Sequence, residues 1–138
     1  MTRKNKIWIG VLILILLSFI PAIPFSVVPP ITLQIVDELG DPLPDISIQQ
    51  TWRHYTFQFG DGIDHASSNE KGTVIFPERI EYFSLAQILF GEVLRLAQFM
   101  NPHASFGPSS FFLPRGNVSG SASYRPDHPL PTEMVVKR

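Results

Sequence analysis

ITLQIVDELGDPLPDISIQQTW, residues 31–52, decides what fold to expect of this chain. Ile31, Leu33 and Ile35 alternate with Thr, Gln and Val, which is the period of a strand that buries one face. Residues 46–52 repeat the alternation, and the DELGDPLPD between the two runs concentrates Asp, Gly and Pro, the residues that set turn dihedrals. The stretch therefore predicts two strands joined by a turn.

The next residues continue this pattern with a shift. Trp52 ends a run whose apolar members share its parity, so we expect it to be buried between sheets. Tyr55, Phe57 and Phe59 then occupy the opposite parity, which predicts a bulge or bend near Arg53 within a strand that carries on beyond it.

Two later segments also alternate. A polar turn leads to TVIFP, in which Val74 and Phe76 face one side, and a final strand is expected from about Thr132, with Met134 and Val136 facing inward.

The composition agrees with a mainly β protein of one domain. The chain has 138 residues, of which 44% are hydrophobic, and its 13 prolines and 9 glycines favour turns over long helices. It contains no cysteine, which excludes a disulfide framework, a thiolate metal site and a cysteine nucleophile. The fold must therefore be stabilised by its core alone.

VDELGDPLPDISIQQTW followed by SSNEKGTVIFP resembles the carboxypeptidase regulatory-like domains, over residues 31–77. The positions that match are Asp37, Gly40, Pro42, Ile46, Ile48, Gly72, Val74 and Phe76. The resemblance implies an antiparallel β-sandwich of the transthyretin-like, immunoglobulin-like kind. It also implies an extracytoplasmic accessory or structural module that is not an enzyme.

The N-terminal residues 1–28 have the features of an export signal. Arg3, Lys4 and Lys6 precede an apolar run from Ile7 to Ile20, and no charged side chain follows until Asp37. The segment is either an uncleaved signal anchor, forming a transmembrane helix, or a signal peptide that is removed.

The residues after this run bear on both alternatives. Residues 21–26 place proline or bulky groups where a cleavage site needs small ones, while Pro21 and Pro24 would end a spanning helix early. The positive-inside rule leaves the N-terminus in the cytoplasm and residues 29–138, as a single domain, outside it. We expect a single-pass membrane protein or, if the segment is removed, a secreted or periplasmic one.

A helix is expected at about residues 84–100, inserted among the strands. Ser84 and Gln87 have capping-box spacing, and an apolar stripe follows, formed by Leu85, Ile88, Leu89, Val93, Leu96 and Met100. A narrow polar strip contains Gly91, where a neighbouring backbone could approach closely. The apolar arc is wider than one sheet can cover, so either loops cover the rest or Phe90 and Leu94 meet a partner or the membrane surface.

The distribution of charge excludes nucleic acid as a partner. Three of the 11 basic residues precede the apolar run, which leaves 8 basic against 12 acidic residues in the remainder of the chain. Binding a phosphate backbone needs clustered Lys and Arg, which this part of the sequence lacks.

Asp61, Asp64 and His65 in GDGIDHA form the densest group of potential metal ligands. An acidic loop with glycines can wrap a hard cation, but this spacing fits no established calcium loop, and a solvated turn is the plainer interpretation. No cofactor is expected.

The sequence thus favours a non-catalytic, extracytoplasmic β-sandwich module, membrane-tethered or secreted, with a structural or binding role toward a protein or other component of the cell envelope. The alternative is a small metal-dependent enzyme or ligand-binding protein that uses the loop at residues 60–65.

Overall fold

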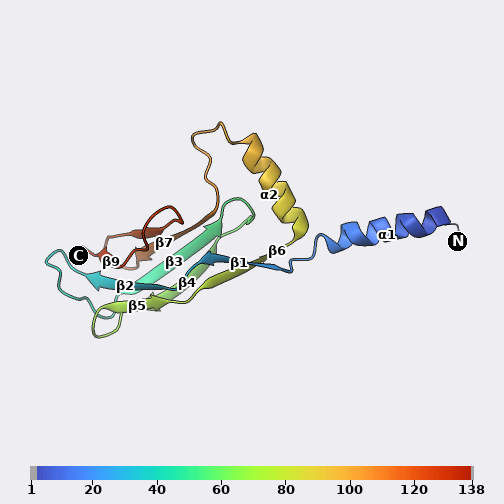
Figure 1. Cartoon of the computed structure of the whole chain (residues 1–138). Helices are drawn as coiled ribbons and strands as arrows, with labels where there is room; N and C mark the ends of the chain where they lie inside the picture. The colour runs from blue at the N-terminus through green and yellow to red at the C-terminus, as the bar shows by residue number, and fades with distance from the viewer. Residues whose placement is uncertain (1–2, 138) are drawn as a thin grey trace.

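Figure 1 shows the computed structural model of the chain, which describes residues 3–137. Within these residues there are two helices, α1 (Arg3–Leu17) and α2 (Leu85–Ala97). The strands are β1 (Ile23–Val28), β2 (Ile31–Val36), β3 (Ser47–His54), β4 (Gly62–Ser67), β5 (Thr73–Phe76), β6 (Arg79–Phe83), β7 (Pro108–Pro114), β8 (Ala122–Tyr124) and β9 (Glu133–Val135). The mainly β character, the N-terminal helix and the helix inserted between strands are confirmed.

The strands form three small sheets, with orders β1-β6, β5-β2-β9 and β4-β3-β7-β8. Every pair of these strands is antiparallel except β2 and β9, which run parallel with Ile35 opposite Met134. The expectation of an antiparallel fold was therefore wrong for this pair. Nothing local in the sequence sets it, because Gln34 and its partner Glu133 lie far apart along the chain.

The turn predicted at residues 37–45 is confirmed, and it joins strands of two different sheets. The Asp37 carboxylate accepts hydrogen bonds from the backbone N–H groups of Leu39 and Asp41, at 2.8 and 2.9 Å. Gly40 has a φ of +89°, a conformation that side chains with a Cβ rarely adopt. The turn thus carries the chain from β2 in one sheet to β3 in another.

One core is shared by all three sheets. Its fully or nearly fully buried side chains are Val27, Val28, Ile31, Leu33, Ile35, Leu43, Ile48, Phe57, Val74, Phe76, Phe83, Phe112, Met134 and Val136. The rings of Phe76 on β5 and Phe112 on β7 lie 5.2 Å apart, so two of the sheets meet directly. The inward positions predicted for β5 and for the last strand are confirmed.

Residues 23–28, which the sequence pattern places in the N-terminal segment 1–28, are a strand in the structure and not a continuation of the helix. They form β1, which pairs with β6, and they contribute the fully buried Val27 and Val28 to the core. Pro21 and Pro24 exclude a continuing helix, and the alternation of Ile23, Phe25 and Val27 suits a strand. The β region thus begins earlier than the sequence indicated.

The bend expected near Arg53 is a full turn instead of a bulge within a longer strand. β3 ends at His54, whose carbonyl accepts hydrogen bonds from the N–H groups of Phe57 and Gln58. Phe57 is buried, whereas Tyr55 and Phe59 are exposed. Trp52, expected to be buried, is only partly so.

Candidate functional site

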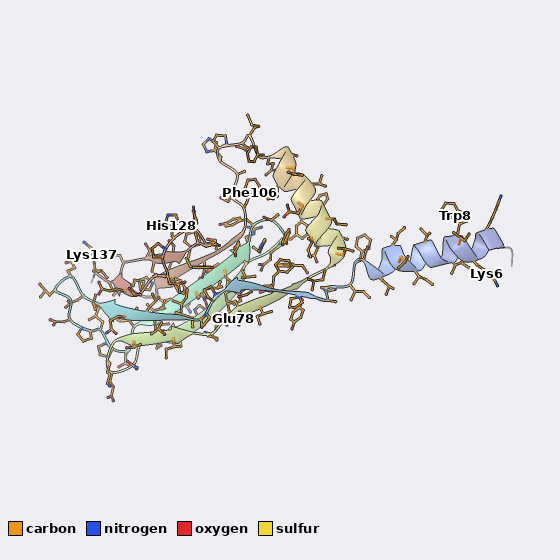
Figure 2. All side chains as sticks on the ribbon, viewed as in Figure 1. Lys6, Trp8, Glu78, Phe106, His128 and Lys137 are labelled. Carbon is orange, nitrogen blue, oxygen red and sulfur yellow. The ribbon has the colours of Figure 1, made fainter. Side chains whose placement is uncertain are left out.

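Helix α1 stands apart from the core. Figure 1 shows it projecting from one end of the β region, with the N-terminus at its far end. Its large apolar side chains from Ile7 to Leu17 are exposed, and Trp8 retains 71% of its accessible surface. In Figure 2 Lys6 and Trp8 both lie on the outer part of this helix.

In the part of the chain that the structure describes, no helix combines the length and the apolar character needed to span a membrane.

Helix α2 begins as its sequence predicts. The Ser84 hydroxyl accepts a hydrogen bond from the backbone N–H of Gln87 at 3.1 Å, and the Gln87 side chain accepts one from the Ser84 N–H at 2.9 Å. This reciprocal capping box satisfies two N–H groups that a helix start leaves without partners. The helix ends at Ala97, three residues before the expected end.

α2 packs on the β region through the side that carries Gly91. Gly91 is its one buried residue, and a Cβ there would lie 2.3 Å from the carbonyl oxygen of Thr56 and 2.7 Å from the Phe57 ring. The close backbone approach expected at Gly91 is confirmed. Glu92 and Arg95 are both partly buried and pair with each other at 2.7 Å.

The apolar arc of α2 faces away from the core. Its exposed side chains are Leu85, Leu89, Phe90, Val93, Leu94 and Leu96, continued beyond the helix by Phe99 and Met100. Of the stripe from Leu85 to Met100, only Ile88 packs against the core, so the stripe is not the face by which α2 contacts the β region. Phe90 and Leu94 are exposed by 54% and 41%, as an interface role requires.

The exposed apolar surfaces of the two helices are continuous. The backbone N–H of Ala86, at the start of α2, donates to the carbonyl of Ser18, just beyond α1, at 2.9 Å. A groove of ≈ 390 Å³ lies at this junction, lined by Phe19, Phe59, Ala86, Gln87 and Phe90. We call the exposed apolar side chains of α1, α2 and this junction the apolar surface.

The proposed metal ligands do not converge. Asp61 pairs with Arg53 at 3.6 Å, and the Asp64 carboxylate binds the guanidinium of Arg79. Asp64 and His65 are consecutive on β4, and their side chains therefore point to opposite faces. Among residues 3–137, no three His, Asp or Glu side chains are placed so that they could hold a metal ion.

Asp64 belongs instead to a polar cluster centred on Arg79. The Arg79 Nε donates to Oε1 of the fully buried Gln50 at 2.9 Å, and Gln50 lies 3.4 Å from the hydroxyl of Ser110. The N–H of His65, and then the Arg79 side chain, donate to the Asp64 carboxylate and hold its pKa below the usual value.

Trp52 on β3 also belongs to this cluster and contacts two residues of β6, Arg79 and Glu81. The Arg79 guanidinium lies 4.6 Å from the centre of the Trp52 ring, and the indole N–H donates to Glu81 at 2.8 Å. The cluster therefore links the β1-β6 sheet to the sheet that contains β3 and β4. One sign of it was present in the sequence, because Gln50 shares the inward parity of Ile48.

His54 lies in an aromatic cluster close to α2. It stacks on Phe57 at 4.3 Å, and the rings of Phe25 and Phe83 contact it by their edges. Its Nδ1 is buried and has no hydrogen-bond partner among residues 3–137, and burial lowers the pKa of the imidazole. No pattern in the sequence indicated a role for this histidine.

Comparison with known proteins yields no relative: no family model, no curated protein and no solved structure matches the chain.

Proposed function

We propose that this protein is a non-catalytic module of the cell envelope that α1 anchors in a membrane, with the β region outside the cytoplasm in a structural or binding role. The observation that carries the proposal is the exposure of the apolar side chains of α1. A helix that is apolar all round belongs in a protein core or in lipid, and α1 packs in no core.

The charges at the two ends of α1 support the orientation. Arg3, Lys4 and Lys6 lie at its start, and no charged residue follows before Asp37. Basic residues stay on the cytoplasmic side of a membrane segment, so we place the chain that follows α1 on the other side. With 15 residues α1 is about 22 Å long, shorter than a bilayer core of about 30 Å, so it would cross by local thinning of the bilayer and snorkelling of Lys4 and Lys6.

Strand β1 favours a retained anchor over a removed signal peptide. Cleavage near residue 28 would take away β1, and with it all the pairing of β6 in the β1-β6 sheet and the buried Val27 and Val28. Only a cut before Ile23 would leave the strand intact, and Pro21 and Pro24 lie close to the last positions available for it.

The β region supports a binding or structural role of the kind seen in carboxypeptidase regulatory-like domains. We infer that the sheets β5-β2-β9 and β4-β3-β7-β8 are the two layers of a transthyretin-like sandwich. The contact of Phe76 with Phe112 and the crossing of the 37–45 turn between the sheets support this arrangement. The left-handed Gly40 and Gly72 stand at two turns that carry the resemblance.

Flotation of the full chain with phospholipid vesicles tests the anchor. We expect the chain to float, and a variant with Leu12→Asp and Leu16→Asp to stay at the bottom of the gradient, because two carboxylates in the apolar segment oppose insertion. The matched control is Ile75→Asp with Val135→Asp, which places two carboxylates at exposed apolar positions outside the apolar surface. Equal flotation of the α1 variant and the unmodified chain would show that α1 is not the anchor.

A further inference from the structure

We propose that α2 is a second membrane contact, whose outward apolar face lies flat in the interface of the same phospholipid bilayer that holds α1. This inference rests on the proposed anchoring role of α1. It assigns an occupant to the exposed apolar face of α2, and it fixes how the β region stands on the membrane.

The helix carries no unpaired charge. Its two charged residues are Glu92 and Arg95, whose side chains retain 40% and 43% of their accessible surface and pair with each other at 2.7 Å. Leu89 and Val93, one turn apart on the outward face, are 59% and 63% exposed. A helix with such a face binds at the boundary of headgroups and acyl chains through its buried apolar area.

The scarcity of basic residues on α2 does not count against this placement. In a helix that lies alone on a membrane, the polar side meets the headgroups and is rich in Lys and Arg. Here the polar side holds Gly91 against the Thr56–Phe57 turn, so it faces protein instead of headgroups. The polar side of α2 therefore contacts the β region, and it does not need the basic residues that would contact headgroups.

The junction of the two helices places α2 at the level where α1 leaves the lipid. The hydrogen bond from Ala86 to Ser18 ties the start of α2 to the end of α1. In Figure 1, α2 runs across the direction of α1 instead of continuing it. A bilayer that α1 enters end-on therefore has its surface along α2, with Phe19 and Phe90 in the groove between the helices.

Lipid is a better occupant of this face than a second copy of the chain. Once α1 is inserted, the bilayer is next to α2 at a high effective concentration, so this second contact is intramolecular. A second copy would have to be recruited, with a further loss of translational and rotational freedom.

The absence of cysteine makes a site-specific test possible. An environment-sensitive fluorophore is attached to the full chain through Leu89→Cys or Val93→Cys, and the chains are reconstituted in vesicles with and without bromine-substituted acyl chains. The matched control is Leu39→Cys, an exposed residue in the turn after β2, whose end is remote from α1 in Figure 1. Circular dichroism verifies that each labelled chain is folded.

We expect the labels at positions 89 and 93 to shift to shorter wavelength and to lose about half or more of their emission with brominated lipid, as for groups within the acyl boundary. The label at position 39 should respond to neither. Labels at 89 and 93 that stay in water while the chain floats would overturn this inference and leave the anchor standing. A chain that does not float at all would refute the anchor itself.

The same measurements distinguish contact of α2 with lipid from self-association of the chain through α2. A blue shift that grows with protein concentration and is not quenched by brominated lipid would show that a second copy covers α2, and it would overturn the lipid assignment.

Discussion

Arg79 on β6 connects its strand to both β3 and β4. Its side chain, only 14% exposed, bridges Gln50 on β3, Asp64 on β4 and the ring of Trp52. Removal of its donors leaves Gln50 Oε1 buried without the charged donor that it now has. An unsatisfied buried polar group costs about 1–3 kcal/mol.

We therefore expect Arg79→Met to lower the free energy of unfolding by about 1–3 kcal/mol, measured by urea denaturation. Arg115→Met is the control, since Arg115 is exposed. Equal midpoints for the two variants would mean that the cluster adds nothing to stability.

The lowered pKa of the Asp64 carboxylate makes the stability of the fold depend on pH in the acidic range. Its pKa is lowered in the folded protein, so its contribution is present above the unfolded pKa of about 4 and is lost as the pH falls through the folded value. The stability difference between the unmodified chain and Asp64→Asn should be constant from pH 7 to 5 and shrink below about pH 4. Urea denaturation at a series of pH values measures it, and a difference that persists at the lowest pH would contradict it.

The lowered pKa of His54 makes the stability of the fold depend on pH in a second, higher range. Burial lowers the pKa of its imidazole, so the unfolded chain binds the proton more tightly, and stability falls as the pH drops below about 6.5. The nearby Glu92 opposes this shift without cancelling it. The variant His54→Phe keeps a ring against Phe57 but has no proton to bind, so it should lose less stability than the unmodified chain between pH 7 and 5. Identical profiles over that range would be evidence against a buried neutral imidazole.

Single residues were predictable where alternation alone decides their side. The inward positions of β5 and of the chain at and just after β9 follow from Val74, Phe76, Met134 and Val136. Arg79 was not predictable, because its partner Gln50 lies 29 positions away and two other strands intervene. Charged side chains in a β protein are usually solvated, and only tertiary contact reveals an exception.

At the scale of elements, the start of α2 was predictable and its facing was not. A capping box involves residues three positions apart, so Ser84 and Gln87 suffice to indicate it. The facing depends on Gly91 meeting the Thr56–Phe57 turn, a contact between distant segments. The position of a small residue, and not the apolar stripe, determined which side of α2 packs.

Gly91→Ala tests that contact. In an exposed helix this change is favourable by about 1 kcal/mol, but here the new Cβ would overlap the Thr56 carbonyl. Overpacking of this kind costs about 1–3 kcal/mol, so we expect a net loss of stability in urea denaturation. Gly10→Ala is the matched control, since a Cβ at Gly10 in α1 meets nothing within 4 Å. A stabilised Gly91→Ala variant would show that α2 is not held at this contact.

At the scale of the whole molecule, the two ends of the β region were the least predictable. β1 lies next to an export-like sequence, so its apolar residues were read as part of the anchor. The parallel pairing of β2 with β9 joins Gln34 to Glu133, and periodicity indicates strands without naming their neighbours.

A substitution at Met134 measures how much β9 contributes to the stability of the fold. It is fully buried opposite Ile35, and truncation of a core Met to Ala costs about 2–5 kcal/mol, from a total of about 5–15 kcal/mol for a domain. We expect Met134→Ala to be the least stable of these variants in thermal denaturation, whereas Val135→Ala, at an exposed neighbouring position, should change little. Similar melting temperatures for the two would contradict a central role for β9.

The parallel pairing of β2 and β9 also limits when the sheet can form during synthesis of the chain. A central strand whose neighbour lies so much later in the sequence cannot complete its sheet while that neighbour is still on the ribosome, and long-range closure of this kind is slow. If α1 delivers the chain to a secretion channel, as the proposed anchoring role implies, the chain would arrive there with its core still open. The unfinished polypeptide would be thin enough to be threaded, and folding would be completed on the far side, after β9 has followed.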